Sequence, residues 1–134
     1  MADTSVWVDY LRTGHRGRAA ALDGIIERGE IVVCGPIAAE LVAGTTDRRR
    51  DELWQLLDGL RWASIDRAEW HLVGDISAAL RQRGSAVPLT DIEIAVAAVA
   101  SDSSLWTRDA HFDRIADALP RLLRYAPARP DASE

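Results

Sequence analysis

The sequence predicts an α/β fold in which helices cover a mainly parallel central sheet. Three observations lead to this prediction. Segments with helical apolar spacing alternate with short runs rich in β-branched residues, which is typical of a parallel sheet with helical crossovers. The run Ile31–Cys34 is apolar throughout, as in strands buried on both faces. The chain has 134 residues, 48% of them hydrophobic, which suffices for one sizeable core.

The same features predict one domain over residues 1–125 and a Pro-punctuated, disordered tail at 126–134. No apolar run approaches the roughly 20 residues of a membrane span. No signal peptide precedes the first helical pattern, and the single Cys34 cannot form an internal disulfide. We therefore expect a cytoplasmic protein that does not associate with a membrane.

The N-terminal segments predict a short strand followed by two helices. Residues 1–3 resemble the end of a strand, and Thr4 or Ser5 is a suitable cap for a helix that continues to Leu11. A Gly-containing connector follows, and a second amphipathic helix is expected over Ala19–Arg28, where the next glycine ends it.

The middle of the chain predicts two strands and three helices. Pro36 is well placed at the first position of a helix over residues 37–43. An arginine-rich connector then leads to a helix over residues 53–60, and residues 61–65 form the weakest predicted strand. Asp66 and Glu69 have the spacing of a cap for a helix that ends near Arg83.

The C-terminal part predicts a helix after Pro88 that is apolar on nearly all sides, as expected of an interior helix. Thr90 and Glu93 have capping-box spacing, so Thr90 is the expected N-cap and Glu93 the residue that reaches back to it. Residues 104–107 are a plausible short strand, a short helix ends near Leu119, and residues 122–125 form a possible last strand.

The composition excludes several classes of chemistry. All sixteen basic residues are arginine, so a phosphate-binding P-loop and Schiff-base catalysis, which both need lysine, are excluded. The three histidines lack HExxH spacing. His111 lies near Asp109, but a Ser–His–Asp triad is set aside because no serine occupies a nucleophile elbow. The net charge of -5 argues against nonspecific attraction of the whole surface to nucleic acid.

Four acidic residues are predicted to face one crevice. Asp3 ends the first strand, Glu40 lies about one turn into the apolar helix after Ile31–Cys34, Asp91 opens the interior helix, and Asp109 follows a later strand. In open α/β sheets, sites lie outside the carboxyl ends of the strands. Crowded carboxylates repel unless a cation lies among them. Hard oxygen ligands suit Mg²⁺ or Mn²⁺, and such ions activate water for phosphodiester hydrolysis.

The chain also resembles PIN-domain ribonucleases, specifically the VapC-type toxins of bacterial toxin–antitoxin pairs. The matching segments, which cover essentially the whole chain to Tyr125, are Asp3-Thr4-Ser5-Val6-Trp7, Ala39-Glu40-Leu41, Pro88-Leu89-Thr90-Asp91-Ile92 and Thr107-Arg108-Asp109-Ala110-His111-Phe112-Asp113. No single motif is specific, but their order and spacing together are. The first strand is shorter here than in the family.

The resemblance implies a PIN-like three-layer sandwich with Asp3, Glu40, Asp91 and Asp109 as a catalytic Mg²⁺ site, in which Mn²⁺ can substitute. Thr4 and Asp113 are candidate outer-shell residues. It further implies an endoribonuclease that cleaves RNA to inhibit translation, a homodimer, and neutralisation by a VapB-type antitoxin. Arg12, Arg16, Arg48 and Arg49 are candidates for contacts with the RNA backbone.

Three of the four acids also have a simpler interpretation, since Asp3 and Asp109 could cap helices and Asp91 could complement a helix dipole. Glu40 inside an apolar helix has no such explanation. An alternative function is a non-catalytic interaction module of the same fold in an antitoxin or operator complex. A haloacid-dehalogenase-like or receiver-like domain is disfavoured because both use lysine. The five tryptophans are expected in the core or at interfaces and not as base-stacking platforms, and Trp7 and Trp54 lie on helices that could form a dimer or antitoxin surface.

Overall fold

The computed structural model describes residues 1–128. The elements in chain order are α1 (Thr4–Thr13), the 3₁₀ turn η1 (Gly14–Arg16), α2 (Ala21–Glu27), β1 (Val32–Cys34), α3 (Gly35–Ala43), α4 (Asp47–Asp58), β2 (Arg61–Ala63), α5 (Arg67–Gln82), α6 (Leu89–Ala100) and α7 (His111–Ala118). The predicted α/β architecture is confirmed. Residues 126–128 lack regular structure, and the rest of the predicted tail, 129–134, lies outside the described residues.

The sheet is parallel, as predicted, but short. Strands β1 and β2 pair in parallel, with Val33 opposite Trp62. The other predicted strands are reduced to single parallel bridges, Ala2 to Trp106 and Leu105 to Arg124. Two main-chain hydrogen bonds form the first of these bridges: Asp3 N–H donates to the Trp106 carbonyl at 3.0 Å, and Trp106 N–H donates to the Met1 carbonyl at 2.8 Å. The residues before Asp3 and before Thr107 are therefore neighbours, although they lie more than 100 positions apart.

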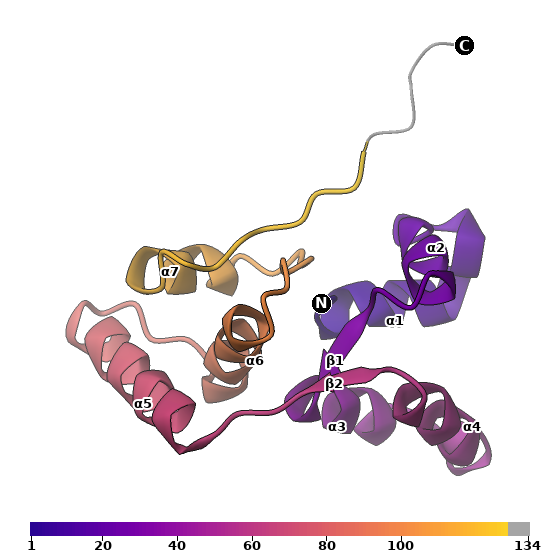
Figure 1. The fold of residues 1–134 in the computed structure, drawn as a ribbon, viewed down its shortest axis with the longest axis horizontal. Helices are drawn as coiled ribbons and strands as arrows, with labels where there is room; N and C mark the ends of the chain where they lie inside the picture. The colour runs from indigo at the N-terminus through magenta and orange to yellow at the C-terminus, as the bar shows by residue number, and fades with distance from the viewer. Residues whose placement is uncertain (129–134) are drawn as a thin grey trace.

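Figure 1 shows α1 and α2 on one side of the two strands, α3 and α4 on the other, and α5, α6 and α7 grouped together. Helix α6 packs against α3, α5 and α7. Its residues Ile92 and Ile94–Ala98 are buried, which explains why this helix is apolar on nearly all sides. All three residues of β1 are buried, as predicted for a central strand.

Two predicted helix caps are wrong and one is confirmed. Asp3, and neither Thr4 nor Ser5, caps α1, because its carboxylate accepts the N–H of Val6. Helix α6 begins at Leu89 with Pro88 as its N-cap. Thr90 therefore lies inside the first turn instead of at the N-cap, so the predicted box of Thr90 and Glu93 is absent. The box of Asp66 and Glu69 at the start of α5 is present.

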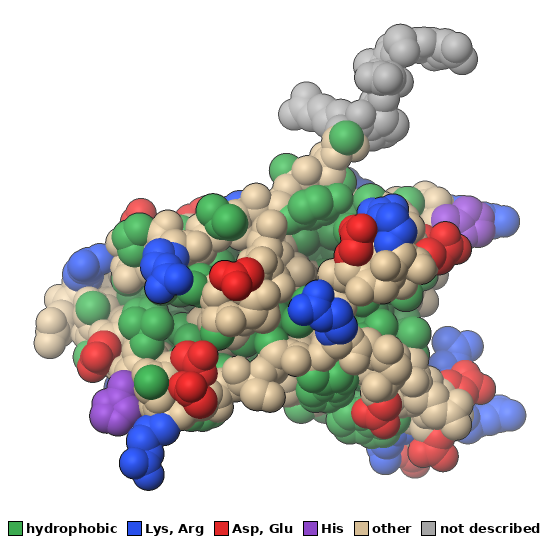
Figure 2. Space-filling view, viewed as in Figure 1, with side chains coloured by type: hydrophobic (Ala, Val, Ile, Leu, Met, Phe, Trp, Pro, Cys, Tyr) green, Lys and Arg blue, Asp and Glu red, His purple; other side chains and the backbone are tan. Residues whose placement is uncertain are grey.

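The described helices include none that combines the length and hydrophobicity needed to cross a membrane. On the face in Figure 2, acidic and basic side chains alternate with apolar ones, and no continuous basic stripe is visible. Trp7 is fully buried, as expected of a core tryptophan, whereas Trp62 and Trp70 are exposed.

Candidate metal centre

Asp3 is held rigidly at the end of the first short strand. The residue is only 4% exposed. One carboxylate oxygen accepts hydrogen bonds from Ser5 Oγ at 2.5 Å and Val6 N–H at 3.3 Å, and the other accepts one from Thr107 Oγ1. A carboxylate offers about four acceptor positions, so at least one stays open for a further ligand.

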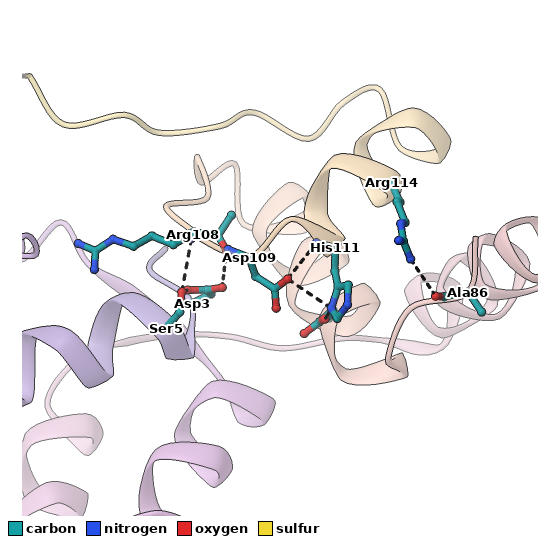
Figure 3. Close-up of polar contacts among 9 residues, drawn as sticks. Asp3, Ser5, Ala86, Arg108, Asp109, His111 and Arg114 are labelled. Carbon is teal, nitrogen blue, oxygen red and sulfur yellow. Dashed lines mark hydrogen bonds and ion pairs between the residues drawn. The ribbon is translucent and has the colours of Figure 1, made fainter. Parts of the chain in front are cut away.

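Thr107 connects Asp3 to Asp109. While its hydroxyl donates to Asp3, its oxygen accepts the main-chain N–H of Asp109 at 3.0 Å. Asp109 in turn accepts the N–H of His111 at 2.9 Å through Oδ1. Figure 3 shows Asp3, Asp109 and His111 following one another across the end of the short strands. The first and last predicted acids are therefore two hydrogen bonds apart.

His111 joins Asp109 to Asp91. Its Nδ1 lies 3.0 Å from Asp91 Oδ2 and 3.3 Å from Asp109 Oδ1. One ligand atom from each of these residues lies within 4.8 Å of the others, an arrangement that could hold a metal ion. From the sequence, His111 is a candidate only for a serine triad, so its contact with both acids was not predicted. The available signal in the sequence was the position of His111, two residues after Asp109 and at the start of a helix.

Asp91 is the third residue after the N-cap of α6 and is half-buried. Burial raises the pKa of its carboxyl above the usual range, the hydrogen bond with His111 lowers it, and the charges of Asp109 and Glu40 raise it further. The net effect is a raised pKa. The protein alone therefore does not supply enough positive charge to stabilise the ionised Asp91 carboxylate. A divalent cation would supply that charge.

Glu40 lies on α3 and, contrary to the interpretation of an acid set among apolar neighbours, its side chain is exposed. Its Oε2 accepts a hydrogen bond from Thr4 Oγ1 at 2.6 Å. Thr4 directly follows Asp3, and the charge of Glu40 raises the pKa of Asp91. Glu40 is thus at the rim of the same centre, and Thr4 contacts it as an outer-shell residue would.

No arginine neutralises the four acids within residues 1–128. The recorded arginine ion pairs involve other carboxylates. Arg108, the neighbour of Asp109, pairs instead with Asp9 of α1, and Figure 3 shows its side chain extending away from Asp3 and Asp109. The centre therefore keeps a net negative charge, which is the condition that favours a bound cation.

Asp113, the other candidate outer-shell residue, contacts an arginine on the surface. It forms an ion pair with Arg124 at 3.1 Å on the surface, where 74% of its side chain is exposed, and it is not a member of the Asp91–Asp109–His111 group. The four arginines proposed for RNA contacts, Arg12, Arg16, Arg48 and Arg49, are all exposed. Their contact with RNA stays a prediction.

The chemistry of this donor set fits a hard divalent cation. Carboxylate oxygens dominate it, and such ions keep waters and share coordination with phosphate oxygens. Asp3 is oriented by hydrogen bonds from hydroxyl groups and a main-chain N–H, which do not titrate near neutral pH. A bound ion could polarise a phosphoryl oxygen and activate water, while the carboxylates hold the ion in place.

Comparison with known proteins agrees with this geometry. The family model described as PIN domain matches residues 1–118. The chain belongs to the PIN-domain family. Among curated relatives, VapC ribonuclease Mb1587 of Mycobacterium bovis and ribonuclease VapC11 of Mycobacterium tuberculosis are each 32% identical over 121 residues. These matches cover 87% of this chain and 90% of each relative, so the PIN-domain chain groups with the VapC ribonucleases.

Solved structures share the fold at lower identity. The chain is similar to a protein of the VapBC2 complex of Rickettsia felis bound to a promoter DNA fragment, with a TM-score of 0.67, 21% identity, and coverage of 93% of this chain and 96% of the other. A second match, to FitAB bound to the IR36 DNA fragment, has a TM-score of 0.71, 21% identity, and coverage of 99% and 98%. Both matches confirm the PIN fold that the sequence resemblance implied.

Proposed function

We propose that this PIN-domain protein is a Mg²⁺-dependent endoribonuclease toxin that hydrolyses RNA phosphodiester bonds. The observation that carries the proposal is the connected group of Asp3, Thr107, Asp109, His111 and Asp91, which has no arginine counter-charge within the described residues. Asp3, Glu40, Asp91 and Asp109 would hold the ion, and Mn²⁺ would substitute for Mg²⁺. The ribonuclease relatives support RNA as the substrate.

Similarity to known proteins also supports a proposal for the partner of this chain and its role in the cell. The similar structures are of VapBC2 and FitAB, so we propose a cognate VapB-type antitoxin as the partner that neutralises this chain. Cleavage of RNA would then inhibit translation when the antitoxin is lost. A homodimer and a cytoplasmic location, the latter supported by the buried free Cys34, belong to the same proposal.

The test is RNA cleavage by the purified chain with Mg²⁺, Mn²⁺ or EDTA. We expect cleavage with either metal and none with EDTA. Asp91→Asn should reduce the rate at least about 100-fold, because it removes a charge that holds the ion. Asp113→Asn is the matched control, because Asp113 is an exposed carboxylate that pairs with Arg124 and lies outside the Asp91–Asp109–His111 group, and it should cleave like the wild type.

Cleavage that continues in EDTA, or in Asp91→Asn protein that retains its fold, would reject the assignment. The alternative, a non-catalytic interaction module of the same fold, predicts that neither cleavage nor melting temperature responds to Mg²⁺ or Mn²⁺. A rise of the melting temperature with either ion therefore discriminates between the two functions.

A further inference from the structure

A pocket separate from the metal centre opens at the carboxyl ends of β1 and β2. Its volume is about 280 Å³, close to the lower limit of about 300 Å³ for small-molecule sites, which is suitable for one planar ring system. Residues that follow the two strands form part of its wall, and Trp62, Trp70 and Glu93 complete it. We call it the tryptophan pocket.

The two indoles of this pocket are unusually accessible. Trp62 of β2 is 42% exposed and Trp70 of α5 is 47% exposed. The indole N–H of Trp62 donates to the Leu57 carbonyl at 2.8 Å, so its ring is held in one orientation. Exposed aromatic surface gathered around a hollow marks a binding site more often than the same residues scattered singly. An aromatic ligand is the partner that two indole faces suit.

Glu93 gives the pocket a polar group without another task. The helix cap predicted for it is absent, because α6 begins after Pro88. Its side chain is half-buried, and burial followed by the charge of Glu40 raises its pKa. Within residues 1–128 its carboxylate has no recorded hydrogen bond or ion pair. As a lining residue, Glu93 can offer two acceptor oxygens to a pocket that is otherwise largely aromatic and apolar.

The pocket lies next to the metal centre. Glu93, which lines the pocket, is two residues after Asp91 on α6, and Asp91 belongs to the group that could hold a metal ion. A polymer bound with a phosphate at the metal centre would therefore have its neighbouring residues near the tryptophan pocket. Single-stranded RNA is recognised by stacking of bases on aromatic rings and by hydrogen bonds to their Watson–Crick edges.

We propose that the tryptophan pocket binds one unpaired base of the RNA substrate, with guanine preferred, beside the phosphodiester bond at the metal centre. This inference rests on the proposed ribonuclease function. Trp62 and Trp70 supply the stacking surface, and the Glu93 carboxylate accepts the N1–H and N2–H groups of guanine. A second copy of the chain is a less suitable occupant, because an apolar interface would bury the Glu93 carboxyl without a partner.

The experiment uses guanosine 5′-monophosphate, which has no phosphodiester bond to cleave, and follows the indole N–H signals of ¹⁵N-labelled protein by NMR. We expect saturable shifts of the Trp62 and Trp70 signals. Trp54 on α4, which does not line the pocket, is the internal control and should not shift. Inosine 5′-monophosphate, which lacks the 2-amino group, and the Glu93→Gln variant should each bind about tenfold more weakly.

RNA cleavage provides the second measurement. Trp70→Ala should raise KM about tenfold with kcat unchanged, since stacking on one aromatic ring contributes about 1–3 kcal/mol per base. The matched control is Leu72→Ala on the same helix, which removes a 37% exposed side chain outside the pocket and should leave KM unchanged.

The outcomes separate the two proposals. Absence of Trp62 and Trp70 shifts, or equal KM values for Trp70→Ala and wild type, would overturn the base pocket even if RNA is cleaved. Binding of the nucleotide without RNA cleavage would support the pocket and reject the nuclease. If the same two signals shift with protein concentration in the absence of nucleotide, a second copy covers the pocket and the base proposal is wrong.

Discussion

The two halves of the metal centre are held in different ways. On one side Asp3 is almost fully buried and accepts bonds from Ser5, Val6 and Thr107, which are hydroxyl or main-chain donors. On the other side Asp91 is half-buried, its pKa is raised mainly by burial, and its partner is the titratable His111. The Asp3 side is part of the folding core, whereas the Asp91 side is completed by the ion that we propose.

Asp3→Ala should have the largest effect, because Asp3 serves both the fold and the site. The substitution removes the cap of α1 and leaves the Thr107 hydroxyl without its acceptor. We expect loss of RNA cleavage and a decrease of about 2–3 kcal/mol in the free energy of unfolding. Urea denaturation measures the second quantity. Unchanged stability would show that the Asp3 side is not structural.

Asp91→Asn tests the opposite half. Cleavage should fall at least about 100-fold, while the free energy of unfolding in EDTA should change by less than about 0.5 kcal/mol or increase. The physical reason is that removing a half-buried charge with a raised pKa relieves a desolvation cost. A stability loss as large as that of Asp3→Ala would contradict the difference between the two halves.

Thr107→Val removes the hydroxyl that connects Asp3 to Asp109 and keeps the volume of the side chain. Asp3 loses a donor and the Asp109 N–H loses its acceptor. We expect a stability loss of about 1–2 kcal/mol and a decrease of about tenfold in kcat, because Asp109 is less well oriented. Thr107→Ser, which retains the hydroxyl, is the control and should restore most of the activity.

His111→Ala should weaken Mg²⁺ binding about tenfold, the lower end of the effect expected for residues that orient metal ligands. His111 contacts both Asp91 and Asp109, so its loss leaves two carboxylates less constrained. Calorimetric titration with Mg²⁺ measures the affinity. His71→Ala on α5, an exposed histidine outside the centre, should bind Mg²⁺ as the wild type does.

The pH dependence of metal stabilisation should give the smallest effect, a few degrees in Tm. Because the pKa of Asp91 is raised in the folded protein, the metal-free fold binds more protons than the unfolded chain between about pH 4 and that raised value. Stability in EDTA should therefore decrease as pH rises through this interval. Mg²⁺ binds the ionised carboxylate, so its stabilising effect should increase over the same interval in the wild type and much less in Asp91→Asn.

The two halves also differ in how far the sequence predicted them. Asp3 and Asp109 were identified as acids at strand ends, but their connection through Thr107 depends on a parallel pairing between residues about 100 positions apart. Local spacing carries no information about such a pair. The caps at Thr4 and Thr90 failed for a related reason: the neighbouring Asp3 and Pro88 compete for the same positions.

Residue types and their spacing were sufficient for the α/β class and the interior position of α6, since burial on all sides and strand-to-helix alternation are local patterns. Side-chain direction was not accessible in the same way. That His111 contacts Asp91, that Arg108 reaches Asp9, and that Trp62 and Trp70 are exposed around Glu93 depend on how α5, α6 and α7 pack together. Packing depends on contacts between residues that are far apart in the sequence, so only the tertiary structure shows it.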